Sequence, residues 1–176
     1  MLSYEHLFEP TSPEGSGAEP QYSACLVFSK ETDLSDLKKS VDDAGKAKWG
    51  EKYDSLKESD SLRLPFRTDR LKEKGYQNGS VYINVRSKQQ PGIASKYAGS
   101  DGKPQLITDH AEVYSGCKVR ATLSVFAYEK AGNRGVSFGL NNVQKLDDGE
   151  RLDGRLKAED DFGAIEDKPA DIDDML

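Results

Sequence analysis

The residues best suited to bind a ligand lie in one strand-like segment, Cys117–Tyr128, in which two kinds of side chain alternate. Successive side chains of a β-strand point to opposite faces. One face of this segment is apolar and is expected to pack into the core. The other face carries two cations and then two aromatic rings, at Lys118, Arg120, Phe126 and Tyr128. A cationic groove with aromatic rings is the surface that holds the phosphates and bases of single-stranded nucleic acid.

A second segment, Ser80–Lys88, repeats this pattern, with valine and isoleucine expected inside and Tyr82, Asn84, Arg86 and Lys88 outside. The two outer rows together predict a DNA-binding surface. In this surface Arg86, Lys88, Lys118 and Arg120 contact phosphates, Tyr82, Phe126 and Tyr128 stack on bases, and Lys96 and Tyr97 form a clamp on the loop Gln89–Pro104. Exposed tyrosine and arginine are also ordinary on strands. The alternative for Phe126 is a position covered by a second layer such as a helix.

Residues for catalysis or metal binding form no recognisable constellation in the sequence. His6 and His110 belong to no zinc-binding motif, and no phosphate-binding glycine loop or nucleophile elbow is present. Acidic pairs such as Asp42 with Asp43, or Asp109 with Glu112, are usually solvated. We therefore predict a binding protein without a cofactor or metal, and a metal-dependent nuclease is kept as the alternative.

The acidic residues are concentrated at the C-terminal end of the chain. The formal net charge is −6, but residues 159–176 alone carry −7, which leaves +1 for the rest. The chain ends Asp171, Ile172, Asp173, Asp174, Met175 and Leu176, which we predict to bind another protein. A tethered acidic segment also competes with phosphate for the cations of a groove. A tail that serves only solubility is the alternative.

The elements needed to position these side chains are mostly strands. Strand-like runs at Gln21–Ser29, Ser80–Lys88 and Gly116–Lys145, and one helix from Leu34 towards Lys48 capped by Asp33, predict a mainly β fold. The expected architecture is a single OB-fold-like antiparallel barrel with one early α-helix. Residues 1–19 are expected to be flexible, residues 20–157 to form the barrel, and residues 158–176 to be a disordered acidic tail.

The two cysteines, Cys25 and Cys117, lie in apolar runs and are expected to be buried free thiols in a reducing cytoplasm. No run of about 20 apolar residues indicates a membrane span, and the N-terminus has no signal-peptide pattern. Trp49 is expected to pack against the core rather than to serve as a stacking platform.

Several short motifs resemble a family of bacteriophage single-stranded-DNA-binding proteins. They are Tyr22-Ser-Ala-Cys-Leu, Tyr76-Gln-Asn-Gly, Ser115-Gly-Cys-Lys-Val-Arg-Ala, Gly135-Val-Ser-Phe-Gly-Leu-Asn-Asn-Val-Gln and Asp160-Asp-Phe. The resemblance runs from about Gln21 to Phe162 and is most specific in Gly-Leu-Asn-Asn-Val-Gln. It implies an OB-fold, sequence-independent binding of single-stranded DNA during phage replication in the host cytoplasm, and an acidic C-terminus for partner proteins. It implies no catalytic residue. Duplex DNA as an additional ligand and a protein-only adaptor stay open as alternatives.

Overall fold

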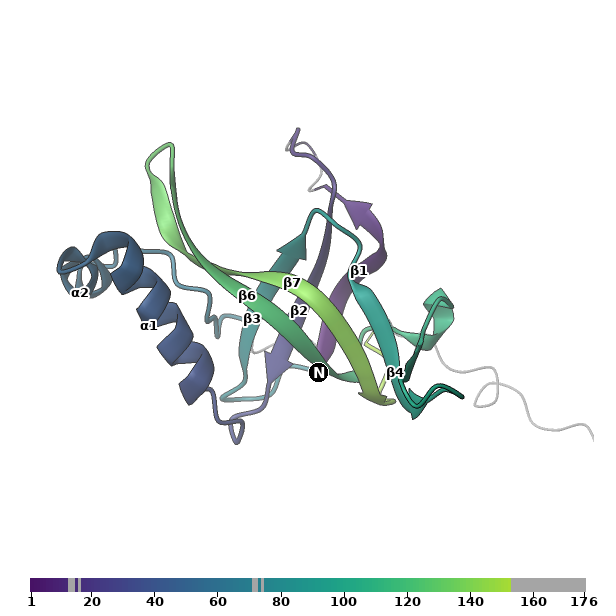
Figure 1. Ribbon diagram of the computed structural model, residues 1–176. Coiled ribbons are helices and arrows are strands. Elements are labelled where there is room, and N and C mark those ends of the chain that lie inside the picture. The colour runs from purple at the N-terminus through teal and green to yellow at the C-terminus, as the bar shows by residue number, and fades with distance from the viewer. Residues whose placement is uncertain (13–14, 16, 71–72, 74, 153–176) are drawn as a thin grey trace, which may run out of the picture.

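The computed structural model describes residues 1–12, 15, 17–70, 73 and 75–152 (Figure 1). The predicted tail and its partner-binding residues, Asp171–Leu176, lie outside these described residues. In chain order the elements are β1 (Leu2–Thr11), β2 (Gln21–Phe28), α1 (Ser35–Trp49), α2 (Lys52–Glu58), β3 (Val81–Ser87), β4 (Gly92–Ala98), β5 (Pro104–Leu106), a short 3-10 helix (His110–Glu112), β6 (Lys118–Lys130) and β7 (Asn133–Asp147). No helix in the described part of the chain is long and apolar enough to cross a membrane.

The strands form one curled sheet in the order β1-β2-β3-β7-β4-β5, with β6 along the other edge of β7. The sheet curls far enough for the start of β1 to meet the start of β6: the Leu2 amide donates to the Cys117 carbonyl (2.9 Å) and the Gly116 amide donates to the Leu2 carbonyl (2.9 Å). The β3–β7 and β4–β7 pairs are parallel, and the other pairs are antiparallel. The prediction of one mainly β barrel is confirmed, with a mixed rather than purely antiparallel sheet.

The Gly-Leu-Asn-Asn-Val-Gln segment marks the point where β7 changes its neighbour from β3 to β4. Thr122 pairs with Asn142 but Leu123 pairs with Leu140, so Asn141 is an extra residue that bends the ribbon. Asn142 then attaches β4, because its Oδ1 accepts from the Gly92 amide at 3.2 Å. Leu140 and Val143 are buried in the core. β7 therefore pairs with β3 before the bulge and with β4 after it, so this one strand belongs to both parts of the sheet.

The N-terminal residues contribute to the core, which corrects the expectation of a flexible segment over residues 1–19. β1 pairs with β2, and its Leu2 and Leu7 are 0% and 1% exposed. Both leucines belong to the main cluster with Ile83, Val85 and Phe138. The sequence did not indicate this strand because its buried and exposed residues do not alternate regularly, and its pairing with β2 shifts register.

The structure has two helices, rather than the single one expected: α1 packs against the β6–β7 hairpin, and α2 packs against α1 (Figure 1). α1 packs Val41 into the core. Its N-cap residue is Leu34 and not Asp33, and the Asp33 side chain accepts a hydrogen bond from the Ser35 amide at 2.9 Å. α2 follows directly after Gly50 and has too few residues to show a periodic apolar pattern. Trp49 packs against the core and donates to Glu129 on β6 at 3.0 Å, so the interpretation of Trp49 as a packing residue is confirmed.

The long central segment is not an irregular loop throughout. Residues 92–98 form β4, which pairs with β7, and residues 104–106 form β5. The glycines and prolines that suggested a loop lie at the ends of these strands, whereas Ile93 between them is 4% exposed and packs into the core. Cys25 and Cys117 are free and buried, as predicted, and burial raises the pKa of both thiols.

Candidate nucleic-acid interface

A cavity of about 550 Å³ lies between β3, the β6–β7 hairpin and the segment that follows α2. We call it the hairpin groove. Its lining residues are Gln21, Arg63, Leu64, Pro65, Arg67, Asn84, Arg86, Ser87, Lys88, Phe126, Tyr128, Val136, Ser137 and Phe138. Four of these residues are cations and none is acidic, in a chain whose net charge is −6. The groove therefore concentrates positive potential beside two aromatic rings.

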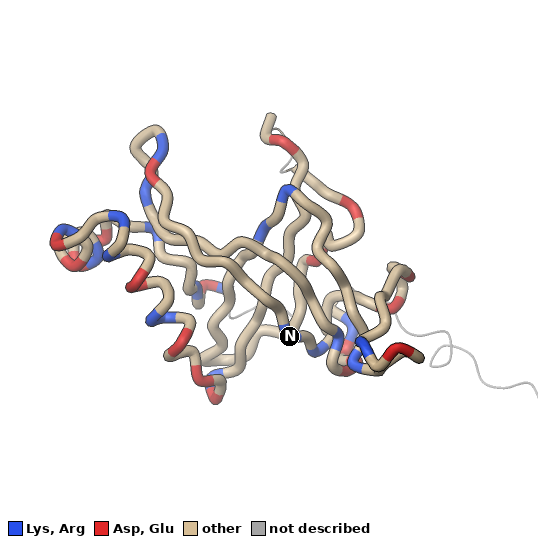
Figure 2. The backbone as a smooth tube through the Cα atoms, viewed as in Figure 1, with Lys and Arg blue, Asp and Glu red and all other residues tan. Residues whose placement is uncertain are grey.

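The cations reach the groove from β3 and from residues 63–67, and not from the ribbon itself. Figure 2 shows that the middle of the β6–β7 ribbon carries no charged position, while acidic and basic positions alternate over the helices. Arg86 and Lys88 stand at the end of β3 beside β7, because Arg86 pairs with Gly139. The uncharged middle of the β6–β7 ribbon thus forms the floor of the groove, and β3 and residues 63–67 supply its positive charges.

Residues 63–67 are held in place by backbone hydrogen bonds to two strands. The Arg63 amide donates to the Arg134 carbonyl at 3.0 Å, and the Val136 amide donates to the Arg63 carbonyl at 3.0 Å. Arg67 and Tyr82 exchange two further bonds of 2.9 Å each. This approach needs a glycine at Gly135, because a Cβ there would lie 2.2 Å from the Arg63 carbonyl oxygen.

The aromatic residues of the hairpin lie on one side of the ribbon and are accessible. Phe126 is 48% exposed, so the alternative of a covering layer does not apply to it. Tyr128 is half-buried and pairs across the hairpin with Gly135, whose missing side chain leaves room for the tyrosine hydroxyl. An accessible ring beside guanidinium groups can stack on a base while a neighbouring phosphate is neutralised.

The cations of the groove differ in how they are paired. Arg67 lies 2.9 Å from Asp69, and the guanidinium together with the Tyr82 hydroxyl holds the pKa of that carboxyl well below its usual range. Lys88 lies 2.9 Å from Glu19. Among the residues that the structure describes, Arg63 and Arg86 form no ion pair. These two guanidinium groups are therefore available to an anionic ligand without breaking an existing pair.

Tyr82 does not belong to the accessible rings, which corrects its prediction as a stacking residue. Its side chain points to the same face of β3 as Asn84 and Arg86, but it is 2% exposed. The Tyr76 ring packs edge-on against the Tyr82 ring, with 5.6 Å between the ring centres, and the Tyr82 hydroxyl donates to Asp69 at 2.6 Å. Tyr76 and Arg70 cover this end of the strand, so no base can reach the Tyr82 ring.

Four other predicted residues lie away from the hairpin groove. Lys96 and Tyr97 are on β4, not on a loop, and face a separate hollow beside Lys145. Lys118 and Arg120 are at the far end of β6, about 20 to 26 Å along the strand from Phe126 at about 3.3 Å per residue. Arg120 donates to Gln144 at 2.6 Å. The predicted cations and rings of β6 do share one face of the strand, but only the rings line the hairpin groove.

Arg63 and Arg67 are the groove residues that sequence reasoning missed. The cation-rich stretch around Arg67 and Arg70 is visible in the sequence, but nothing in it indicates that it runs beside the hairpin. The acidic pairs considered for a metal have structural partners instead. Asp42 accepts from Tyr53 and Lys57, and Asp109 accepts from the Ala111 amide. The described residues contain no group of three or more potential metal ligands.

A curled, mainly β barrel with a cationic and aromatic groove places the chain among the OB-fold-like proteins, and comparison with known proteins agrees. The chain belongs to the family of the Enterobacter phage Enc34 ssDNA-binding protein, whose model matches residues 1–175. This confirms the family resemblance and extends it over the first 20 residues. A putative protein p50 of Acyrthosiphon pisum secondary endosymbiont phage 1 is 31% identical over 163 residues, or 87% of this chain and 83% of that protein.

Solved structures share the fold at lower identity. The single-stranded DNA-binding protein from bacteriophage Enc34, in complex with ssDNA, superposes with a TM-score of 0.64 at 24% identity, covering 86% of this chain and 84% of the other. The single-stranded DNA-binding protein gp2.5 encoded by bacteriophage T7 gives a TM-score of 0.58 at 12% identity, covering 89% and 96%. The OB-fold-like class predicted from the strand pattern is therefore confirmed.

Proposed function

We propose that the chain binds single-stranded DNA in the hairpin groove without sequence preference, and coats it during phage DNA replication and recombination in the host cytoplasm. The observation that carries this proposal is a groove with four cations, no carboxylate and an exposed phenylalanine in an otherwise acidic chain. Family membership supports it, because the Enc34 protein is a single-stranded DNA-binding protein. The proposed role includes no catalytic step.

Binding occurs through two complementary contacts. Arg63, Arg67, Arg86 and Lys88 neutralise successive phosphates, which releases counterions and gives affinity that does not depend on sequence. Phe126 and Tyr128 stack on bases, which every base permits because every base has a flat face. Arg67 and Lys88 exchange their carboxylate partners, Asp69 and Glu19, for phosphate, while Arg63 and Arg86 lose none.

A salt titration tests the phosphate contacts. Fluorescence anisotropy of labelled oligo-dT at several salt concentrations gives the slope of log K against log salt, about −0.7 for each phosphate contact to a single strand. The double variant Arg86→Gln/Lys88→Gln is expected to bind more weakly and to reduce the size of this slope by about 1.4. Lys38→Gln/Lys48→Gln on the exposed face of α1 is the matched control and should keep the wild-type slope. Equal slopes for all three proteins would contradict the groove assignment.

We further propose that the acidic residues 159–176 regulate access to the groove and that Asp171–Leu176 recruit replication proteins. The support is the charge of −7 on this segment, which opposes the cations of the groove. A truncation that ends at Ala158 is expected to bind oligo-dT several-fold more tightly at low salt, because a tethered competitor has been removed. Unchanged affinity would contradict the regulatory role and leave partner recruitment as the proposed role of these residues.

A further inference from the structure

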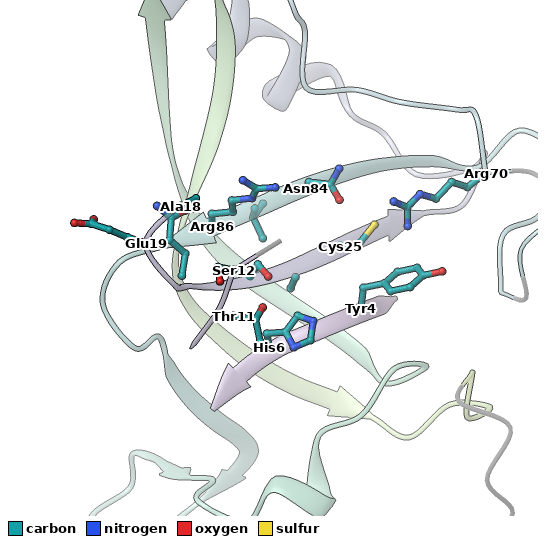
Figure 3. A pocket seen from close by; sticks show the side chains of 14 residues that line it. Tyr4, His6, Thr11, Ser12, Ala18, Glu19, Cys25, Arg70, Asn84 and Arg86 are labelled. Atoms are coloured by element: carbon teal, nitrogen blue, oxygen red, sulfur yellow. The ribbon is translucent and has the colours of Figure 1, made fainter. Parts of the chain in front are cut away.

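A cavity of about 780 Å³ lies between the end of β2, the first half of β6 and the start of α1. We call it the β2–β6 cavity. Figure 3 shows a different cavity, beside β1, β2 and β3, where the backbone of β1 is distorted at Tyr4 (φ of +46°). That one shares Gln21, Asn84 and Arg86 with the hairpin groove and is an extension of it. The β2–β6 cavity shares no lining residue with either and is therefore a separate surface of the described part of the chain.

The β2–β6 cavity is apolar inside and cationic at its edge. Its lining residues are Met1, Leu26, Val27, Phe28, Ser29, Thr32, Leu37, Gly75, Gln77, Ser80, Lys118, Val119, Arg120, Ala121 and Leu123. Lys118 and Arg120 are exposed cations, and none of the lining residues is acidic. Arg120 donates to the neutral Gln144 at 2.6 Å. Neither cation forms an ion pair with a residue that the structure describes.

This cavity leaves part of the hydrophobic core accessible along the first half of β6. α1 runs from Leu37, which lines the cavity, to Trp49, which is bonded to Glu129 near the other end of β6. Val119 and Ala121, on the inner face of β6, pack against the core but are only half-buried at the cavity wall. Apolar surface of this kind is stabilised when another apolar side chain removes it from water.

The chain itself arrives at this cavity with Leu152, the last residue that the structure describes. The Leu152 amide donates to the Ser115 carbonyl at 3.0 Å. A Cβ built at Gly75 would lie 2.8 Å from Leu152 Cδ2 and 2.8 Å from Met1 Cε, so the three residues meet. Gly75 and Met1 both line the cavity. The residues that follow Leu152 therefore start at its edge.

Residues 160–165, Asp-Asp-Phe-Gly-Ala-Ile, match the chemistry of this cavity. Two carboxylates precede two large apolar side chains, and the cavity offers two cations without carboxylate partners beside an apolar wall. Phe162 comes ten residues after Leu152, a span of up to about 33 Å at about 3.3 Å per residue. The segment is therefore long enough to enter the cavity from the edge where it starts.

We propose that the β2–β6 cavity binds residues 160–165 of the same chain, with Phe162 in its apolar interior and the two preceding carboxylates paired with Lys118 and Arg120. This gives a role to the cations of β6 that lie far from the hairpin groove. It also divides the acidic segment into an anchor and the eleven residues 166–176, to which the regulatory and recruiting roles proposed above then fall. The inference goes beyond DNA binding, and its test needs no DNA.

Disulfide trapping in the full chain tests this placement. Gln77→Cys puts a thiol at the exposed edge of the cavity, and Ala164→Cys puts one close to Phe162 in sequence. A disulfide within one chain is expected to form at least about tenfold faster in this pair than in Gln105→Cys/Ala164→Cys, because docking raises the effective concentration of the two thiols. Gln105 is the matched control, since it is exposed on β5 and does not line the cavity. The two native cysteines are buried and do not compete.

Further changes in the Gln77→Cys/Ala164→Cys protein test the two kinds of contact. Phe162→Ser should slow the trapping about tenfold, because it removes the apolar anchor, whereas Phe162→Leu should keep the rate. The charge reversal Lys118→Glu/Arg120→Glu should also slow it about tenfold, because like charges then oppose each other. Adding Asp160→Lys/Asp161→Lys to the charge reversal should restore the original rate.

Three results would overturn the proposal. They are equal trapping rates for the cavity pair and the control pair, rates that neither Phe162→Ser nor the charge reversal changes, and a disulfide that forms only between two chains. The last would appear as a dimer on a non-reducing gel, at a rate that rises with protein concentration, and would assign the cavity to a second copy. Circular dichroism melting confirms that each variant is folded. None of these results bears on the hairpin groove, which the salt titration tests separately.

Discussion

Replacing both rings of the hairpin groove, in Phe126→Ala/Tyr128→Ala, is expected to lower the affinity for oligo-dT at least about 30-fold. Each stacked base contributes about 1 to 3 kcal/mol when its aromatic partner is truncated, and both rings lie in the same cavity. The loss should be nearly independent of salt, because no charge is removed. Fluorescence anisotropy at two salt concentrations measures the affinity and its salt slope together.

Tyr97→Ala provides the comparison for that double variant. Tyr97 is 66% exposed on β4, yet it lies outside the hairpin groove. We therefore expect it to bind oligo-dT like the wild type. A large loss for Tyr97→Ala together with no loss for the double variant would move the binding surface to β4, where the sequence-based clamp of Lys96 and Tyr97 would regain its role.

The second large effect is expected from Gly135→Ala, which alters the support of the groove instead of its surface. The added Cβ would lie 2.2 Å from the backbone oxygen of Arg63, and backbone cannot move aside as a flexible side chain can. We expect the free energy of unfolding to fall by about 3 kcal/mol. DNA affinity should fall as well, because the segment that carries Arg63 and Arg67 can no longer hydrogen-bond to the hairpin.

Urea denaturation measures this change, with Gly132→Ala as the control. Gly132 lies at the tip of the same hairpin with φ of +79°, and a Cβ there meets no atom within 4 Å. Its substitution is expected to cost only about 1 kcal/mol, the price of the left-handed backbone. Similar losses for the two variants would show that the contact between Gly135 and Arg63 is not what makes the first one costly.

The β6–β7 hairpin was predictable because its alternation is long and its turn contains a glycine. β1 was not, because the distortion at Tyr4 interrupts the alternation that identifies a strand. The side of β3 on which Tyr82 lies follows from alternation alone. Its burial depends on Tyr76, which returns to pack on it from an irregular segment. Alternation thus gives the face of a residue but not what covers that face.

The groove was partly predictable for the same reason. Arg86, Lys88, Phe126 and Tyr128 were identified from strand patterns and do line one cavity. Arg63 and Arg67 were not, since they reach it through backbone bonds from a segment without regular structure. Lys118 and Arg120 were grouped with Phe126 because they share a face, although a strand of this length separates its two ends widely. Sequence periodicity therefore predicted which way these side chains point, but not how far apart they lie.

The walls of the hairpin groove come from four stretches of chain, at Gln21, residues 63–67, residues 84–88 and the β6–β7 ribbon. The parallel pairing of Val85 with Phe138 closes it only after most of the chain is available. Pairings between residues so far apart in sequence form slowly, because closing a large loop costs conformational entropy before the contact contributes favourable free energy. A nascent chain on the ribosome therefore has no complete groove until β7 has emerged. We therefore expect affinity for oligo-dT to appear only after β7 has paired with β3.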